Sequence, residues 1–162
     1  MSKKTIVIAE AGENHCGDIQ LAYELIDMST RAGCDYVKFQ LYDSAKVSSS
    51  DPEKEWFKQV EVSDSMWQDL IIHSKKTGIE PLATPWDIEK AEVILKSGAT
   101  SIKIASFHII DLELLEFVNI NFNKVFLSTG MSSMLEIEKA IATLRDVKEL
   151  YVLHCVSEYP LP

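Results

Sequence analysis

Two lysines occur inside short apolar runs, where lysine is uncommon. Lys38 lies in the run 36–39 and Lys103 in the run 101–105. Burying an ammonium group costs free energy unless a counter-charge or a ligand compensates it. Each lysine therefore suits a phosphate or carboxylate ligand, although a structural ion pair, or an edge strand that keeps the lysine in water, would explain the same pattern. We take the two lysines as candidate anchors for a small anion.

Hydroxyl and amide side chains stand at the ends of the same kind of run. They are Gln40, Thr84, Ser106, Ser128 and Thr129. Hydroxyl groups donate hydrogen bonds to anions, but Ser and Thr also commonly cap the helix that follows a strand. The pattern is therefore compatible with an anion site and with ordinary helix capping.

A carboxylate and a histidine complete the set of candidate groups. Glu10 directly follows the first apolar run, residues 5–9, and a desolvated carboxylate there would suit general acid–base catalysis. Neutralisation by one of the lysines is the alternative. His154 ends the last run, residues 150–154, as either a hydrogen-bonded structural residue or a metal ligand.

Six apolar runs alternate with helical patterns along the chain. The predicted strands are residues 5–9, 36–39, 80–84, 101–105, 124–128 and 150–154, and the predicted helices are residues 21–32, 64–76, 88–96, 112–118 and 135–145. Residues 42–62 are polar and irregular, and we expect a loop there. Strict alternation of strand and helix predicts an α/β fold with a parallel sheet buried on both faces.

Two architectures fit this alternation. A doubly wound open sheet of six strands would be complete in 162 residues, whereas a TIM barrel, at about 250 residues, would lack two strand–helix units. Nearly every predicted strand ends in a polar group. Because all strand ends of a barrel surround one mouth, while only some converge in an open sheet, this favours an incomplete TIM barrel.

Composition narrows the class of partner. The net charge is −9 and the pI about 4.9, which argues against binding to nucleic acid or to an anionic membrane. The three cysteines match no zinc motif, and no apolar stretch approaches the ~20 residues of a membrane span. We therefore expect a cytoplasmic protein with reduced cysteines.

Taken together, the strand-end motifs resemble one family. They are IAEAGENHCGD (8–18), AGCDYVKFQ (32–40), ATPWD (83–87), IKIAS (102–106), LSTGM (127–131) and LHCVSEYP (153–160). This order of motifs resembles the sialic acid synthase family, which includes the N-acetylneuraminate, legionaminate and pseudaminate synthases. The resemblance implies a TIM barrel followed by an antifreeze-like domain. It also implies condensation of phosphoenolpyruvate with an N-acetylated aldose such as N-acetylmannosamine, with a divalent metal, Mn²⁺ or Mg²⁺, as cofactor.

The resemblance also implies a role for each candidate residue. Phosphoenolpyruvate would be bound by Lys38, Gln40, Thr84, Lys103, Ser106 and Ser128. Glu10 would handle protons and sugar-ring opening, and His154 would be the first of two metal-ligand histidines. After the serine of the IAS motif the family usually has a small residue and then a sugar-binding carboxylate. Phe107 and His108 stand there instead, so His108 would meet the sugar with a different charge and reach.

Residues 1–162 would then be the N-terminal part of the barrel, with about six strand–helix units. The second metal histidine, the last two barrel strands and the antifreeze-like domain would lie beyond residue 162, and the full-length protein would be a homodimer. This segment alone would be inactive. The alternative is a truncated, non-catalytic fragment or paralogue that keeps the anion-binding pocket.

Overall fold

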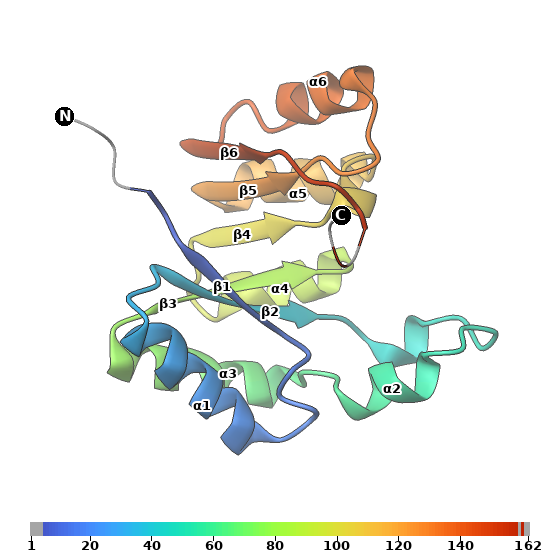
Figure 1. Cartoon of the computed structure of the whole chain (residues 1–162). Helices are drawn as coiled ribbons and strands as arrows, with labels where there is room; N and C mark the ends of the chain where they lie inside the picture. Colours follow the sequence, from blue (N-terminus) through green and yellow to red (C-terminus); the bar gives the residue numbers. More distant parts are fainter. Residues whose placement is uncertain (1–4, 159, 161–162) are drawn as a thin grey trace. The chain divides into compact units, whose positions relative to one another are not determined.

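Strands and helices alternate in the computed structural model, which describes residues 5–158 and residue 160, except that two helices follow one another between the second and third strands (Figure 1). The strands in these residues are β1 (Ile8–Gly12), β2 (Tyr36–Leu41), β3 (Glu80–Pro85), β4 (Ser101–Ile104), β5 (Lys124–Ser128) and β6 (Glu149–Leu153). The α-helices are α1 (Ile19–Arg31), α2 (Lys54–Gln59), α3 (Asp64–Thr77), α4 (Ile88–Lys96), α5 (Leu112–Asn121) and α6 (Met134–Thr143). Two short 3-10 turns, η1 (Ser44–Lys46) and η2 (Ser106–His108), follow β2 and β4.

The strands form two three-stranded sheets, in the orders β1-β2-β3 and β4-β5-β6. The pairs β1–β2, β4–β5 and β5–β6 are parallel, as the strand–helix alternation predicts. The chain divides into two compact units, Met1–Ala83 and Thr84–Pro162. The prediction of an α/β fold with parallel sheets is confirmed.

The first unit buries the faces of its helices against its sheet. Helix α1 begins at Asp18, whose carboxylate accepts a hydrogen bond from the Gln20 amide, and helix α3 begins at Ser63 in the same way. Helix α3 ends at Gly78, which takes the left-handed conformation (φ 84°) that favours glycine. Helices α1 and α3 pack side by side, and the fully buried side chains include Trp67, Phe39 and Ile26 (Figure 1).

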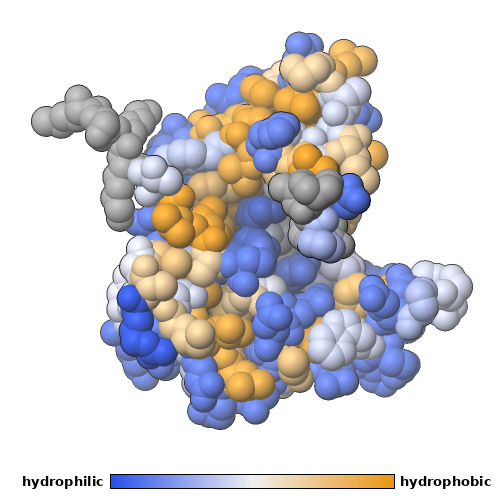
Figure 2. All heavy atoms as spheres, in the orientation of Figure 1, coloured by the Kyte–Doolittle hydropathy of each residue, from blue (hydrophilic) through white to orange (hydrophobic). Residues whose placement is uncertain are grey.

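The second unit uses aspartate and serine caps to start its helices after β-strands. Asp87 caps α4 and Asp111 caps α5 through backbone amides. Ser133 and Glu136 form a reciprocal capping box at the start of α6. Only Ala140 of α6 is buried, and the space-filling view shows hydrophobic side chains on the surface around this helix (Figure 2).

Two of the sequence predictions were wrong in detail. The first strand is Ile8–Gly12 rather than residues 5–9. The amide of Val7 donates to the Asp35 carboxylate instead of to a backbone carbonyl of β2, so the strand pairing begins at Ile8. The pairing includes Glu10, which is opposite Lys38. Glu10 therefore lies inside the strand and not after it.

The segment 42–62 is the second correction, because it is not a plain loop. It contains η1 and the short helix α2, and its apolar residues Tyr42, Val60 and Val62 are buried. The Lys54 ammonium donates to the Val47 carbonyl (2.6 Å), which ties the segment to itself. We call residues 42–62 the excursion. Among the described residues, no helix is long and apolar enough to cross a membrane.

Candidate anion-binding strand ends

The first unit joins two of the predicted site residues, Glu10 and Lys38. They are directly opposite each other in the parallel pairing of β1 and β2, and the Lys38 Nζ lies 2.9 Å from the Glu10 Oε2. The Lys38 side chain is 6% exposed and the Glu10 side chain 56% exposed. The ion pair that the sequence offered as an alternative is thus present, and the described residues do not desolvate Glu10.

The backbone next to Glu10 is irregular, and this irregularity affects the direction in which the Glu10 side chain points. The pairing shifts between Glu10 and Gly12: Glu10 is opposite Lys38, and Gly12 is opposite Phe39. Ala11 is therefore an extra residue on β1, and Gly12 takes a left-handed conformation (φ 51°). Such bulges redirect side chains and occur often beside active sites. The strand alternation puts Gln40 on the same face of β2 as Lys38.

The second unit brings hydroxyl groups together beyond the ends of β4 and β5. The Ser106 Oγ accepts a hydrogen bond from the Gly130 amide at 3.0 Å, and the Thr129 hydroxyl donates to the Leu153 carbonyl at 2.8 Å. A hydroxyl oxygen that accepts one bond keeps its own proton for another partner. Ser106 is therefore arranged to donate a hydrogen bond, which is what an anion requires.

Gly130 permits this arrangement because it has no side chain. A Cβ at this position would lie 2.9 Å from the Ser106 Oγ and would overlap the Ser157 Oγ. Sequence reasoning did not single out Gly130, although its place directly after Ser128 and Thr129 is a signal that could have found it.

Of the remaining predicted anion ligands, Thr84 and Ser128 are buried and Lys103 is half-buried. Ser128 is the last residue of β5, and Lys103 is the third residue of β4, opposite Phe126 of β5. A buried hydroxyl or ammonium group needs a partner, so these positions suit a ligand or a fixed internal contact.

His108 lies in η2, with its side chain 14% exposed. Its Nδ1 is 3.7 Å from the Asp111 Oδ2, and its Nε2 is buried without a hydrogen-bond partner among the described residues. Burial lowers the pKa of this imidazole, while the carboxylates of Asp111 and Asp87 act in the opposite direction. The imidazole therefore favours its neutral form, although Asp87 and Asp111, which cap α4 and α5, are its neighbouring charges.

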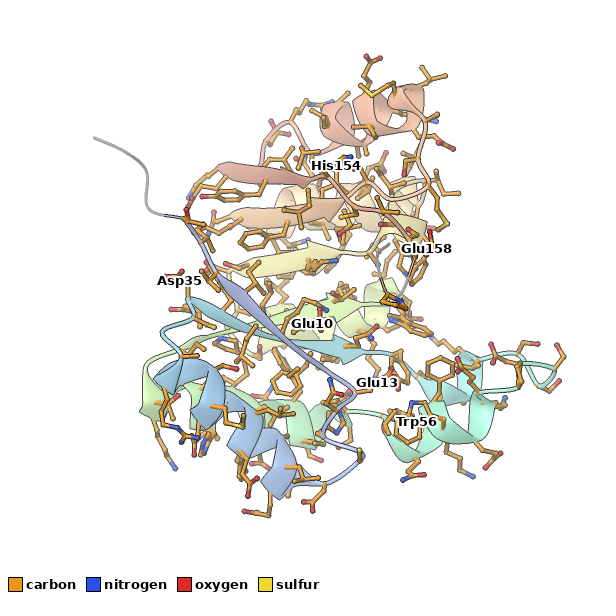
Figure 3. The ribbon with its side chains drawn as sticks, viewed as in Figure 1. Glu10, Glu13, Asp35, Trp56, His154 and Glu158 are labelled. Carbon is orange, nitrogen blue, oxygen red and sulfur yellow. The ribbon has the colours of Figure 1, made fainter. Side chains whose placement is uncertain are left out.

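His154 directly follows β6 and is exposed (Figure 3). No group of three His, Cys, Asp or Glu side chains that could hold a metal ion occurs within residues 5–158 and 160. The described residues therefore do not by themselves fit a divalent metal, because such ions need several oxygen or nitrogen ligands at once.

Outside the predicted set, Glu13 of the loop after β1 interacts with two residues of the segment that follows β2, Tyr42 and Trp56. Glu13 accepts a hydrogen bond from the Trp56 indole (3.3 Å), and its carboxylate also acts on the buried phenol of Tyr42. This contact could hardly be predicted from the sequence, because Glu13 and Trp56 are 43 residues apart.

The chain was compared with known protein families and with individual proteins. The model of the NeuB family matches residues 25–162. The chain is 34% identical to the N,N'-diacetyllegionaminic acid synthase of Campylobacter jejuni, over 99% of this chain and 54% of that protein. It is 37% identical to an uncharacterized protein of Methanocaldococcus jannaschii, over 98% of this chain and 48% of that protein.

A solved structure agrees with these relatives. The crystal structure of the N-acetylneuraminic acid (sialic acid) synthetase from Leptospira borgpetersenii, in complex with citrate, matches with a TM-score of 0.92 and 34% identity. The match covers 99% of this chain and 57% of that one. The chain spans about half the length of the curated relatives it matches. With the family model covering most of its residues, this chain belongs to the NeuB family.

Proposed function

We propose that the protein to which this chain belongs condenses phosphoenolpyruvate with an N-acetylated aldose resembling N-acetylmannosamine. The products would be a nine-carbon α-keto acid of the sialic acid type and free phosphate. Family membership and the names of the relatives, a legionaminic acid synthase and a sialic acid synthetase, support the reaction class. We also propose that the chain forms about six strand–helix units of a TIM barrel.

The observation that carries this proposal is the Lys38–Glu10 pair. A nearly buried ammonium group is held at 2.9 Å by a carboxylate that is itself 56% exposed. An incoming anion can therefore reach the pair from the solvent side and share the lysine. The same geometry keeps a carboxylate beside the bound anion, where it can accept or return a proton.

In this proposal the phosphoenolpyruvate ligands are Lys38, Gln40, Thr84, Lys103, Ser106 and Ser128. The lysines balance the negative charges of the substrate, and the hydroxyl groups donate hydrogen bonds to its oxygens. Ser106 supports this role best, because the Gly130 amide already occupies its acceptor side and leaves its proton for a ligand.

The reaction follows from the electron pairs of phosphoenolpyruvate. Its C3 attacks the carbonyl carbon of the open-chain aldose, and the C2=C3 pair forms the new C–C bond. Positive charge develops at C2, where a water oxygen adds and loses a proton. The bond between C2 and the bridging oxygen then breaks, and phosphate leaves with that oxygen. Glu10 transfers protons, while fixed charges and positioning lower the barrier.

A divalent metal, Mn²⁺ or Mg²⁺, remains part of the proposal for the whole protein, with His154 as one ligand. The described residues do not fit a metal by themselves, and the reaction steps above use only the residues named for them. His108 is the proposed sugar-binding residue. A homodimer and a cytoplasmic location, where phosphoenolpyruvate is produced, belong to the same proposal.

A second candidate is a non-catalytic protein that keeps the anion-binding residues. His108, at the position where the family usually has a sugar-binding carboxylate, favours it. Calorimetric titration with phosphoenolpyruvate, followed by an assay for phosphate with N-acetylmannosamine and Mn²⁺, separates the two. Binding with release supports the synthase, binding without release supports the second candidate, and no binding contradicts both.

A further inference from the structure

The loop between β1 and α1, residues 12–18, is held in an unusual conformation. Gly12, Cys16 and Gly17 all have left-handed backbones, with φ of 51°, 51° and 81°. Cys16 has a Cβ, so its conformation costs roughly 1 kcal/mol or more. Such a backbone persists only when its surroundings hold it. We call residues 12–18 the β1 loop.

The excursion holds the β1 loop at two points. At the first, the Trp56 indole of α2 donates to the Glu13 Oε2 (3.3 Å), as the labelled side chains illustrate (Figure 3). At the second, a Cβ on Gly17 would overlap the backbone carbonyl oxygen of Gln59, so helix α2 ends directly against the loop. The contact requires glycine both for its φ and for the space.

Glu13 also contacts the segment that follows β2. Burial raises the pKa of the Tyr42 phenol, and the charges of Glu13 and Glu61 raise it further. The Glu13 Oε1 is buried and has no hydrogen-bond partner among the described residues. The Tyr42 hydroxyl lies 3.3 Å from the Phe57 carbonyl, and the two rings meet edge to face. One carboxylate thus joins three segments: the β1 loop, the end of β2 and helix α2.

This junction lies immediately beyond the bulge that aims Glu10. The extra residue Ala11 and the left-handed Gly12 separate Glu10 from Glu13. A Cβ on Gly12 would lie 3.4 Å from the Glu10 Oε1, so the Glu10 carboxylate lies beside the left-handed Gly12 of the bulge. If the chain beyond the bulge is released, this backbone can move from its place beside the carboxylate and free the Glu10 side chain to change its direction.

We propose that Glu13 is a positioning residue that locks the β1 bulge to the excursion and thereby keeps Glu10 aimed at Lys38. We use the word lock for the two interactions of Glu13, one with Trp56 and one with Tyr42, that hold the β1 loop against the excursion. Only the kinetic consequence rests on the proposed function. The structural consequence, a fixed β1 loop, does not depend on it.

Hydrogen exchange in the intact protein tests the lock itself. The amides of Cys16 and Asp18 bond carbonyls within the loop, and the Asn14 amide bonds the carbonyl of Ala11 in the bulge, so their exchange reports the opening of the loop. Glu13→Ala and Trp56→Phe should each speed exchange about tenfold, the effect of losing one hydrogen bond to a charged group. The double variant should exchange no faster than the faster single variant.

The matched control is Glu55→Ala, which removes an exposed carboxylate from the residue next to Trp56 on α2. It should leave loop exchange unchanged. Glu13→Gln keeps an acceptor oxygen for the indole and should restore much of the protection. Unchanged exchange in Glu13→Ala, or strictly additive effects of the two substitutions, would overturn the proposal.

Kinetics test whether Glu13 acts through Glu10. With phosphoenolpyruvate and N-acetylmannosamine, Glu13→Ala should lower kcat about tenfold, again the effect of one such hydrogen bond, and change the KM for phosphoenolpyruvate much less. In a Glu10→Gln background the same substitution should change kcat no further. A full additional loss would show a general structural defect and contradict the proposal. If the wild-type protein releases no phosphate, the proposed function fails, while hydrogen exchange still decides the lock.

Discussion

The Lys38–Glu10 pair predicts opposite outcomes for its two partners. The Lys38 side chain is 6% exposed and the Glu10 side chain 56% exposed. Replacing Lys38 by methionine leaves a carboxylate that water already solvates. Replacing Glu10 by glutamine removes a counter-charge from a nearly buried ammonium. The first change should therefore spare stability and the second should not.

The magnitudes follow from this asymmetry. Removing one member of an ion pair is costly when it leaves a buried charge behind, but the Glu10 carboxylate is 56% exposed, so Lys38→Met should change the free energy of unfolding by less than about 1 kcal/mol. Removing one partner of a fully buried pair costs about 3 to 5 kcal/mol, but solvent screens Glu10 here. We therefore expect Glu10→Gln to cost about 1 to 3 kcal/mol.

For phosphoenolpyruvate binding, we expect Lys38→Met to have the larger effect and Glu10→Gln the smaller one. Lys38→Met removes a charge-assisted hydrogen bond to phosphoenolpyruvate worth about 1.5 to 3 kcal/mol, which weakens binding about 10- to 150-fold. Glu10→Gln keeps the lysine and should weaken binding much less. Urea unfolding and calorimetric titration of both variants measure the two quantities, with the exposed Lys58→Met as control.

The reasoning would be refuted by a clear reversal. If Lys38→Met costs more than Glu10→Gln in stability, the lysine is a structural group whose partners include more than the carboxylate. If Lys38→Met binds phosphoenolpyruvate as tightly as the wild type, the lysine is not an anion anchor.

Three further predictions concern other positions. Gly130→Ala should raise the KM for phosphoenolpyruvate about tenfold, because the added Cβ would displace the Ser106 hydroxyl and the ligand would lose one neutral hydrogen bond. In a Ser106→Ala background the same substitution should raise the KM little further, and steady-state kinetics measures both effects. Gly17→Ala should lower the free energy of unfolding by more than about 2 kcal/mol, because φ is 81° and the added Cβ meets the Gln59 carbonyl, and urea unfolding measures this. Burial lowers the pKa of His108 below its ordinary 6.5, so the unfolded chain binds more protons than the folded chain as the pH falls below 6.5. The stability that the neutral imidazole contributes is therefore fully present above pH 6.5 and is lost as the pH falls. In urea unfolding at pH 5 and pH 7, His108→Gln should lose less stability between the two pH values than the wild type.

The sequence predicted the elements whose patterns are strong. Five of the six strands lie within one or two residues of their predicted ends, because Val, Ile and Leu runs bounded by helices have few alternatives. The first strand was displaced because hydrophobicity does not show that the Val7 amide bonds an aspartate side chain. Helix α2 was missed because six residues carry too little periodicity to identify a helix.

The candidate site residues follow from residue type, whereas their geometry does not. A lysine in a strand indicates a partner, yet the register that puts Lys38 opposite Glu10 includes a bulge that no pattern marks. Glu13 and Trp56 meet only after the excursion folds back, which is a long-range contact. His15 shows the same limit, because it stands in a polar loop and is nevertheless fully buried.

The most direct test of the proposed reaction follows the bridging oxygen of phosphoenolpyruvate. The intact protein is supplied with N-acetylmannosamine, Mn²⁺ and phosphoenolpyruvate that carries ¹⁸O between C2 and phosphorus, and the phosphate released is analysed by mass. Condensation with C–O cleavage predicts that the phosphate retains the ¹⁸O and that one nine-carbon keto acid forms for each phosphate. Release of unlabelled phosphate, or release without the sugar, would mean P–O cleavage or simple hydrolysis and would contradict the proposed synthase.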